Sequence, residues 1–127
     1  MPINAPSLAN LSLVEFGGRL RELKDNGVNF FHIDLMDGHY VPALCLPPRT
    51  VRDVKALCPD AVAEVHLMVD DPTAYLDELR DNGADYPVVR QAAALGVDVL
   101  VTGIYMIFAQ PDGIPGAVRR FNAEFPQ

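Results

Sequence analysis

FFHIDLMDGHYVP, residues 30–42, places a histidine and a carboxylate two positions apart inside an apolar run. Strand side chains alternate between two faces, so we expect His32 and Asp34 to share a face with Phe30 and Met36. A buried carboxylate without a partner is costly. The polar face must therefore either satisfy itself with hydrogen bonds or hold a cation, whereas the opposite face is wholly apolar, with Phe31, Ile33 and Leu35.

A second strand-like run, AVAEVHLMV at residues 61–69, repeats the pattern with Glu64, His66 and Met68 on one face. Two such strands side by side would bring two imidazoles and a carboxylate together, which is typical of divalent-metal sites. Two other interpretations stay open. The polar groups could simply hydrogen-bond to one another in a core, or two histidines and one carboxylate could form a non-haem iron site.

Composition indicates one small, acidic, soluble domain over residues 1–127. The chain has 10 basic against 17 acidic residues, which argues against a nucleic-acid partner. No run approaches the roughly 20 apolar residues that cross a bilayer, and the first residues lack a signal-peptide pattern. We therefore expect a cytoplasmic protein with no membrane partner. Cys45 and Cys58 fit neither a disulfide framework nor zinc-ligand spacing and are expected to be free thiols.

Capping residues predict where the helices begin. Ser12 with Glu15 three positions later is a capping-box pattern, which predicts a helix from Ser12 to the Asn26-Gly27 turn. Asp71 before Pro72 predicts another helix start. That helix should end at Asn82-Gly83 and bury Tyr75, Leu76 and Leu79. The remaining expected elements are strands at 3–8, 30–36 and 61–69, an irregular proline-rich loop at 43–48, and a helix at 50–57.

An internal echo indicates a repeating α/β architecture. The segments LKDNGVNF (23–30) and LRDNGADY (79–86) nearly repeat each other, and ALGVDV (94–99) is a shorter version. Each has the pattern of a helix end, a glycine turn and the start of a buried strand, which favours a parallel sheet. Chance similarity of common helix ends is the alternative.

The spacing shortens after Asp85. A parallel crossover takes about 10–12 residues or more, and the interval between Asp85 and Asp98 cannot hold a strand and such a crossover. We therefore expect Tyr86 to begin at most a very short strand. Residues 87–95 are expected to form one helix, followed by a buried strand at 97–103.

Residues 32–42 (HIDLMDGHYVP), with the preceding APSL at 5–8 and the following EVHLMV at 64–69, resemble the ribulose-phosphate 3-epimerase family, including its allulose-6-phosphate relatives. The resemblance covers residues 3–85 and, more weakly, 92–125. It implies an α/β fold, a partial (β/α) barrel with about four parallel strands and helices outside, lacking the central part of the barrel. Such a half-barrel has open edges, so the resemblance also implies a homo-oligomer.

The resemblance further implies a metal-dependent 3-epimerase of ketose phosphates, such as the ribulose 5-phosphate and xylulose 5-phosphate pair. His32, Asp34 and His66 correspond to metal ligands, and Asp34 also corresponds to a catalytic acid/base. The ion would be divalent, Zn, Mn, Fe or Co. Positions that line the sugar-phosphate site are Ser7, Met36, Met68 and Gly103, while His39 could either help close the site or be a solvated loop residue.

Several features depart from the family pattern. The second catalytic and ligating aspartate belongs to a seventh strand that this chain lacks, and Asp98 lies at the wrong end of its strand to replace it. Much of the phosphate cradle is missing as well, and Ala43 stands where an Asn usually follows Val-Pro. We therefore expect impaired or absent epimerase activity. The alternative is a non-catalytic metal- or sugar-phosphate-binding half-barrel that acts through self-assembly.

Overall fold

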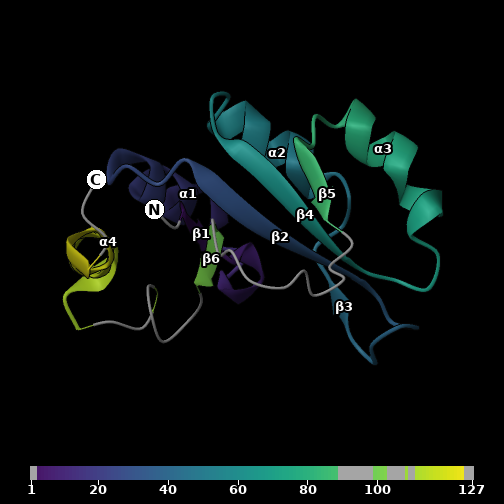
Figure 1. The fold of residues 1–127 in the computed structure, drawn as a ribbon, viewed down its shortest axis with the longest axis horizontal. Helices are drawn as coiled ribbons and strands as arrows, with labels where there is room; N and C mark the ends of the chain where they lie inside the picture. The colour runs from purple at the N-terminus through teal and green to yellow at the C-terminus, as the bar shows by residue number, and fades with distance from the viewer. Residues whose placement is uncertain (1–2, 89–98, 103–107, 109–110, 125–127) are drawn as a thin grey trace.

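The structure is a computed structural model that describes residues 3–88, 99–102, 108 and 111–124. Strands and helices alternate along most of the chain (Figure 1). The strands are β1 (Ile3–Pro6), β2 (Phe30–Asp37), β3 (Leu44–Cys45), β4 (Val62–Met68), β5 (Tyr86–Val88) and β6 (Val99–Thr102). The α-helices are α1 (Phe16–Asp25), α2 (Thr50–Leu57), α3 (Leu76–Asp81) and α4 (Gly113–Glu124), and short 3-10 segments cover Leu8–Asn10 and Pro72–Tyr75.

The strands form two hydrogen-bonded groups. One is a four-stranded sheet in the order β3-β2-β4-β5, in which β2, β4 and β5 are parallel and β3 is antiparallel to β2. The other is the parallel pair β1-β6. A backbone bridge between Ser7 and His32 links β1 to β2, which gives the neighbour order β6, β1, β2, β4, β5. The predicted α/β class with parallel strands is confirmed.

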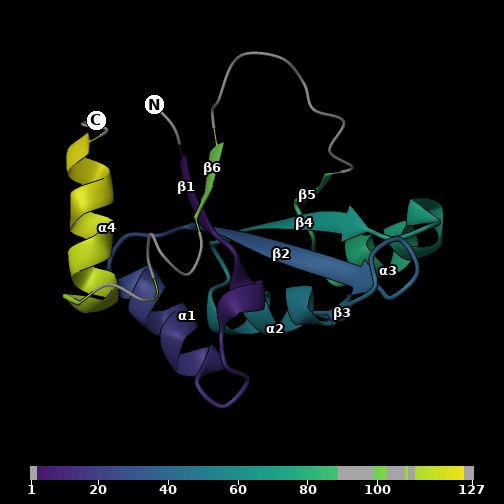
Figure 2. The same cartoon turned by 90° about the horizontal axis from the view of Figure 1, so that it is seen from below.

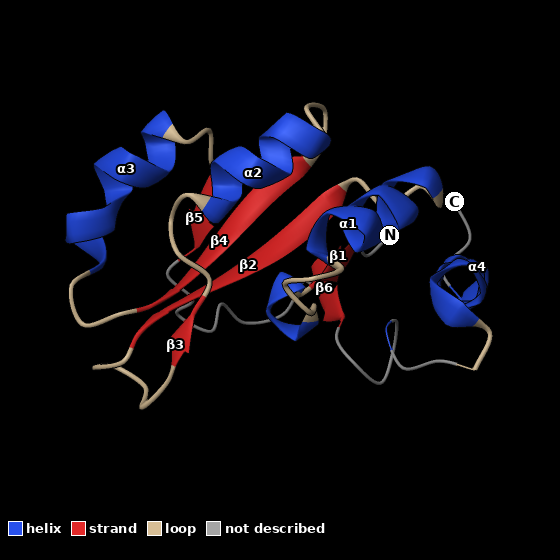
Figure 3. Ribbon diagram, turned by 180° about the vertical axis from the view of Figure 1, so that it is seen from behind, coloured by secondary structure: helices blue, strands red, loops and turns tan. Residues whose placement is uncertain are grey.

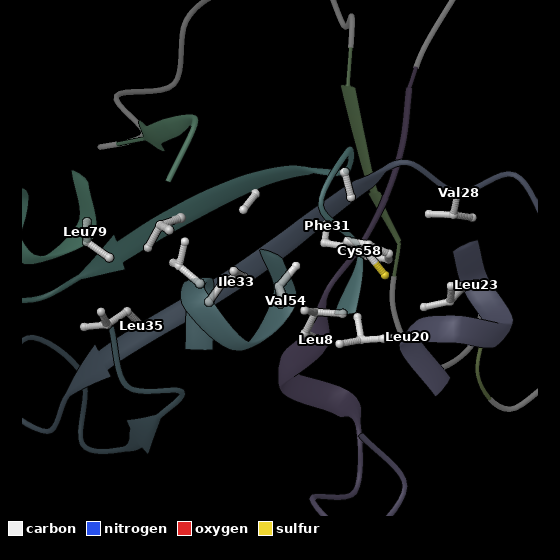
Figure 4. Packing of buried hydrophobic residues seen from close by; sticks show 14 of the residues in the cluster. Leu8, Leu20, Leu23, Val28, Phe31, Ile33, Leu35, Val54, Cys58 and Leu79 are labelled. Atoms are coloured by element: carbon white, nitrogen blue, oxygen red, sulfur yellow. The ribbon is translucent and has the colours of Figure 1, made fainter. Parts of the chain in front are cut away.

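Helices α1 and α2 lie on one side of strands β2 and β4 (Figure 2). Figure 3 shows the same two helices from behind, in front of the strands, with α3 further along. Phe31 and Ile33 of β2 point into the core between strands and helices, as the alternation of β2 predicts. They pack with Leu20 of α1 and Val54 of α2 (Figure 4). Each such fully buried side chain contributes about 1.5–3 kcal/mol.

Two predicted helix ends and one whole helix are confirmed. Gly27 and Gly83 have φ angles of 87° and 91°, a left-handed conformation that favours glycine. These are the glycines of the two longer echo segments, and each leads into a strand of the four-stranded sheet, whereas Gly96 of the shorter segment lies outside the described residues. Helix α2 has the predicted bounds, with Val51 and Val54 fully buried.

The predicted capping box is wrong. Helix α1 begins at Phe16, and Ser12 only accepts, through its carbonyl, a turn hydrogen bond from the N–H of Glu15. The Glu15 carboxylate pairs with Arg19 one turn on, at 3.5 Å. Asp71 does accept a hydrogen bond from the N–H of Thr73, as an N-cap should, but the helix starts as a 3-10 turn and Leu76 is 41% exposed.

One short strand replaces a predicted loop, and another is the very short strand that the sequence allows at Tyr86. Leu44 and Cys45 form β3 against the end of β2, within the segment predicted as a loop. Tyr86–Val88 form β5 beside β4, so the predicted helix cannot begin at Pro87. The rest of that helix, residues 89–95, lies outside the described residues, as do residues 97, 98 and 103 of the last predicted strand.

Cys45 and Cys58 are free, as expected, and burial raises the pKa of the Cys58 thiol. Among the helices that the structure describes, none has both the length and the apolar character needed to span a bilayer.

Candidate metal centre

Strands β2 and β4 run parallel with their residues in direct register, and this register builds the site. Asp34 lies opposite His66, and His32 lies opposite Glu64. All four side chains project from the face that the helices do not cover, because positions of equal parity on paired strands share a face. Two separate sequence motifs therefore become one polar cluster.

Asp34 is the centre of this cluster. Its Oδ1 lies 3.1 Å from Nε2 of His32 and 3.1 Å from Nδ1 of His66. Its Oδ2 accepts a 2.5 Å hydrogen bond from the hydroxyl of Ser7, which directly follows β1. The two imidazole rings are tilted by 48° with centroids 5.4 Å apart. The polar face predicted from the alternation of β2 thus exists, and it draws on β2, β4 and the residue that follows β1.

Glu64 completes the cluster beneath His32. Its Oε2 lies 3.2 Å from Nδ1 of His32, so this imidazole has a carboxylate at each ring nitrogen. The alternation of residues 61–69 predicts Glu64 on this face but indicates no role for it. The missing information was the register, since a shift by one residue would have sent Glu64 to the opposite face.

Burial and hydrogen bonding oppose each other in the electrostatics of the cluster. Burial alone would lower the pKa of His32, but hydrogen bonds to Asp34 and Glu64 outweigh it and raise that pKa to about 9. Burial would likewise raise the pKa of Asp34, yet the hydrogen bonds from His32 and Ser7 lower it to about 2. Asp34 is therefore ionised at neutral pH and is available as a ligand for a cation.

The donor atoms suit a divalent transition metal. His32, Asp34 and His66 each offer one ligand atom, and these atoms lie within 4.8 Å of one another. Two imidazole nitrogens and one carboxylate oxygen are ligands that zinc, manganese, iron and cobalt all accept. The residues present thus fit the ion expected from the sequence.

The other residues predicted from the sequence differ in whether the structure describes them and in whether they lie near the cluster. Met36 and Met68 lie directly opposite each other on β2 and β4, both half-buried. Gly103 and Asp98 lie outside the described residues. His39 stays away from the cluster, with its side chain 75% exposed and its Nδ1 3.1 Å from the carbonyl oxygen of Asp37.

Asp37 is a second residue whose role sequence analysis missed. One carboxylate oxygen accepts hydrogen bonds from the N–H groups of His39 and Tyr40, at 2.8 and 3.1 Å. The other accepts a 3.0 Å hydrogen bond from the N–H of Asp70, which follows β4. Asp37 therefore ties together the two loops that follow the cluster-bearing strands. Asp side chains often accept a hydrogen bond from the backbone N–H two residues later. This Asx-turn tendency is the local signal for the contact between Asp37 and the N–H of His39.

Comparison with known proteins places this chain in a family. Residues 3–104 match the Ribulose-phosphate 3 epimerase family. The ribulose-phosphate 3-epimerase of Bacillus subtilis is 33% identical over 81 residues, 64% of this chain and 37% of that protein. The enzyme of that name from Chlamydia trachomatis is 30% identical over 100 residues, 79% of this chain and 42% of that protein.

A third relative, the ribulose-phosphate 3-epimerase of Rhodobacter capsulatus, is 35% identical over 81 residues, 64% of this chain and 35% of that protein. The chain thus spans less than half the length of each of these three curated relatives. The family match nevertheless covers most of the chain and contains His32, Asp34 and His66. This protein belongs to the ribulose-phosphate 3-epimerase family.

Proposed function

We propose that this chain binds a divalent metal ion through His32, Asp34 and His66 and presents a ketose phosphate to Asp34, as a partial 3-epimerase. The convergence of both imidazoles on Oδ1 of Asp34 carries the proposal. Belonging to the epimerase family supports the substrate class. When bound, the ion would act as a Lewis acid that stabilises negative charge on neighbouring substrate oxygens.

Asp34 is the proposed acid/base residue. Its ionised carboxylate would accept the proton from carbon 3 of the substrate and return it on the same face. Ser7 would hold the other carboxylate oxygen, and Met36 and Met68 would give the sugar an apolar floor. Gly103 is proposed to contact substrate on the strength of the family resemblance alone.

Inversion at carbon 3 needs a second group on the opposite face of the sugar. The family's second aspartate has no counterpart that we recognise in this sequence, and one general acid/base typically contributes about 10² to 10⁴ in rate. We therefore expect epimerisation at least about a thousandfold below that of a complete enzyme, once weakened phosphate binding is added. The measurement is turnover of ribulose 5-phosphate and of allulose 6-phosphate.

The strand order β6, β1, β2, β4, β5 supports a partial (β/α) barrel as the architecture of the whole chain, residues 1–127. In such an arrangement the side of β2 and β4 opposite the helices would be the interior. The same uncovered side motivates the second candidate, a non-catalytic half-barrel that acts through self-assembly. No helix in the described part of the chain covers that side, so a second copy could close it.

Metal analysis tests the proposed ligands. We expect about one equivalent of zinc, manganese, iron or cobalt in the parent protein and none in His66→Ala. His39→Ala is the matched control, since His39 is the chain's one remaining histidine and lies outside the cluster. Equal metal content in the parent and in His66→Ala would disprove the ligand assignment.

Proton exchange tests the catalytic role and separates the two candidates. In deuterated water, Asp34 should exchange the carbon 3 proton of the substrate without inverting the centre, and Asp34→Asn should abolish that exchange. Metal and sugar-phosphate binding without any exchange in the parent protein would favour the non-catalytic half-barrel. Full turnover lost in Asp34→Asn would show that the chain supplies a second acid.

A further inference from the structure

Glu64 is one of the least exposed charged residues in the described chain. It is 5% exposed, and its cross-strand partner His32 is 2% exposed. A carboxylate removed from water in this way needs a compensating interaction. His32 supplies it, through the 3.2 Å contact between Oε2 of Glu64 and Nδ1 of the imidazole.

Each ring nitrogen of His32 faces a carboxylate oxygen, but only Asp34 belongs to the proposed ligand set. With a metal bound between His32 and Asp34, Glu64 remains the acceptor for an N–H at Nδ1. The other nitrogen, Nε2, faces Oδ1 of Asp34 at 3.1 Å. A metal ligand needs a free lone pair, which places the ligand atom of His32 at Nε2 and keeps the ring in its present orientation.

His66 provides an internal comparison. Its Nδ1 faces Oδ1 of Asp34, but among the described contacts no carboxylate holds its second nitrogen. Its side chain is also the more exposed of the two imidazoles. The cluster is therefore asymmetric, with His32 held at both nitrogens and His66 at one.

We propose that Glu64 is the positioning residue of this centre, which orients His32 and fixes its Nδ1–H tautomer so that Nε2 serves as the ligand. The proposal rests on the metal site proposed above. Glu64 itself is not a ligand, because the imidazole ring of His32 stands between its carboxylate and Asp34. Carboxylate–histidine–metal arrangements of this kind typically affect metal affinity by about 10- to 100-fold.

Two substitutions of similar size test the role. Glu64→Met removes the acceptor and keeps the volume, so zinc affinity should fall by about 10- to 100-fold while the stoichiometry stays at one. Glu64→Gln keeps an oxygen that can accept from Nδ1 but loses the charge, so its affinity should lie between Glu64→Met and the parent. Glu78→Gln is the control, since it removes the same charge from an exposed position on α3.

A measurement on the parent protein keeps the proposal testable even if both variants fail to fold. In the zinc-loaded parent, nitrogen NMR should show His32 protonated at Nδ1 and ligating through Nε2. Protonation at Nε2 would overturn the proposal. So would unchanged zinc affinity in Glu64→Met, or complete loss of metal in Glu64→Met, which would make Glu64 a ligand.

His66→Ala separates this inference from the proposed function. Loss of metal in His66→Ala together with unchanged affinity in Glu64→Met would refute the role of Glu64 and leave the metal site standing. Retention of metal in His66→Ala, or no metal in the parent, would refute the metal site and with it the positioning role.

Discussion

The carboxylate of Asp34 contacts Ser7, His32 and His66, and its two oxygens have different partners. Oδ1 faces both imidazoles, whereas Oδ2 accepts from the Ser7 hydroxyl at 2.5 Å. A short hydrogen bond to an ionised group is stronger than one between neutral groups. Ser7 therefore holds one oxygen in place and leaves the other directed at the histidines.

Ser7→Ala should lower the free energy of unfolding by about 1–3 kcal/mol, because a buried charged acceptor loses its donor. Chemical denaturation of the metal-free protein measures this change. Ser12→Ala is the matched control, since Ser12 is exposed and only its backbone carbonyl makes a described contact. Equal stability of the two variants would show that the Ser7 hydroxyl is not needed.

The residues of the cluster differ in how well they can be predicted from the sequence alone. His32, Asp34 and His66 were predicted together because strand alternation is local and survives any fold that pairs the two strands. The contact of Glu64 with His32 could not be predicted, because it depends on the register of two strands about 30 residues apart. Ser7 entered only through family resemblance, since its neighbour Asp34 is distant in sequence.

At the scale of elements, Asp37 connects the loops that follow β2 and β4 through hydrogen bonds to both. The N–H of Asp70 is the largest cause that keeps the pKa of Asp37 below its usual range; burial opposes this, and the N–H groups of His39 and Tyr40 add to it. A lowered folded pKa means that the carboxylate contributes stability above its unfolded pKa of about 3.9. That contribution is lost as pH falls through the lower folded value.

Asp37→Asn should therefore flatten the pH dependence of stability. Relative to the parent, the variant should lose stability at neutral pH, and the difference should shrink as pH falls below about 4. Denaturation midpoints measured from pH 7 to pH 2 test this. A constant difference across that range would mean that the charge of Asp37 is irrelevant to the loop contacts.

Gly27 and Gly18 form a natural pair for testing the helix end. A Cβ added at either position would meet no heavy atom within 4 Å, but Gly27 has a φ of 87° and Gly18 lies inside α1. Gly27→Ala should cost about 1–2 kcal/mol for the left-handed conformation. Gly18→Ala should instead stabilise by about 0.5–1 kcal/mol.

Thermal or chemical unfolding of both glycine variants provides the measurement. The two variants should change the free energy of unfolding in opposite directions, although both substitutions add the same methyl group in equally open space. Stabilisation by Gly27→Ala would contradict the reading of the echoed Asn-Gly motif as a helix stop.

The element boundaries show where local rules fail. Helix α2 and the glycine turns were predicted because their signals lie within the element itself. Strand β3 has only two residues, and they form a strand only by pairing with the end of β2. Nothing within Leu44–Cys45 itself therefore predicts it. The predicted Ser12 capping box is absent because the hydrogen bond from the N–H of Glu15 to the carbonyl of Ser12 closes a turn, and α1 begins only after it, at Phe16.

At the scale of the whole molecule, apolar surface points to self-association. Leu13 and Val14 before α1 and Leu44 in β3 are exposed, and Leu13 and Leu44 line the same groove. Phe30 and Met36 lie on the face of β2 that no described helix covers. Leu13, Met36 and Leu44 line one groove, and an exposed apolar groove of this kind is typical of interaction sites.

We therefore expect a solution mass above the 13.9 kDa of one chain. Light scattering across a wide concentration range measures it. A mass of one chain at every concentration would contradict the prediction.

The bridge between Ser7 and His32 joins the β1-β6 pair to the four-stranded sheet, and the same two residues bracket Asp34. The contacts that complete the polar cluster therefore also hold the two groups of strands together. A ligand that binds the cluster only in the folded state adds its binding free energy to the stability of the folded state, and thus to the contact between the two groups of strands. Slower amide hydrogen exchange along β1 would then serve as a gauge of site occupancy, readable without any substrate or turnover.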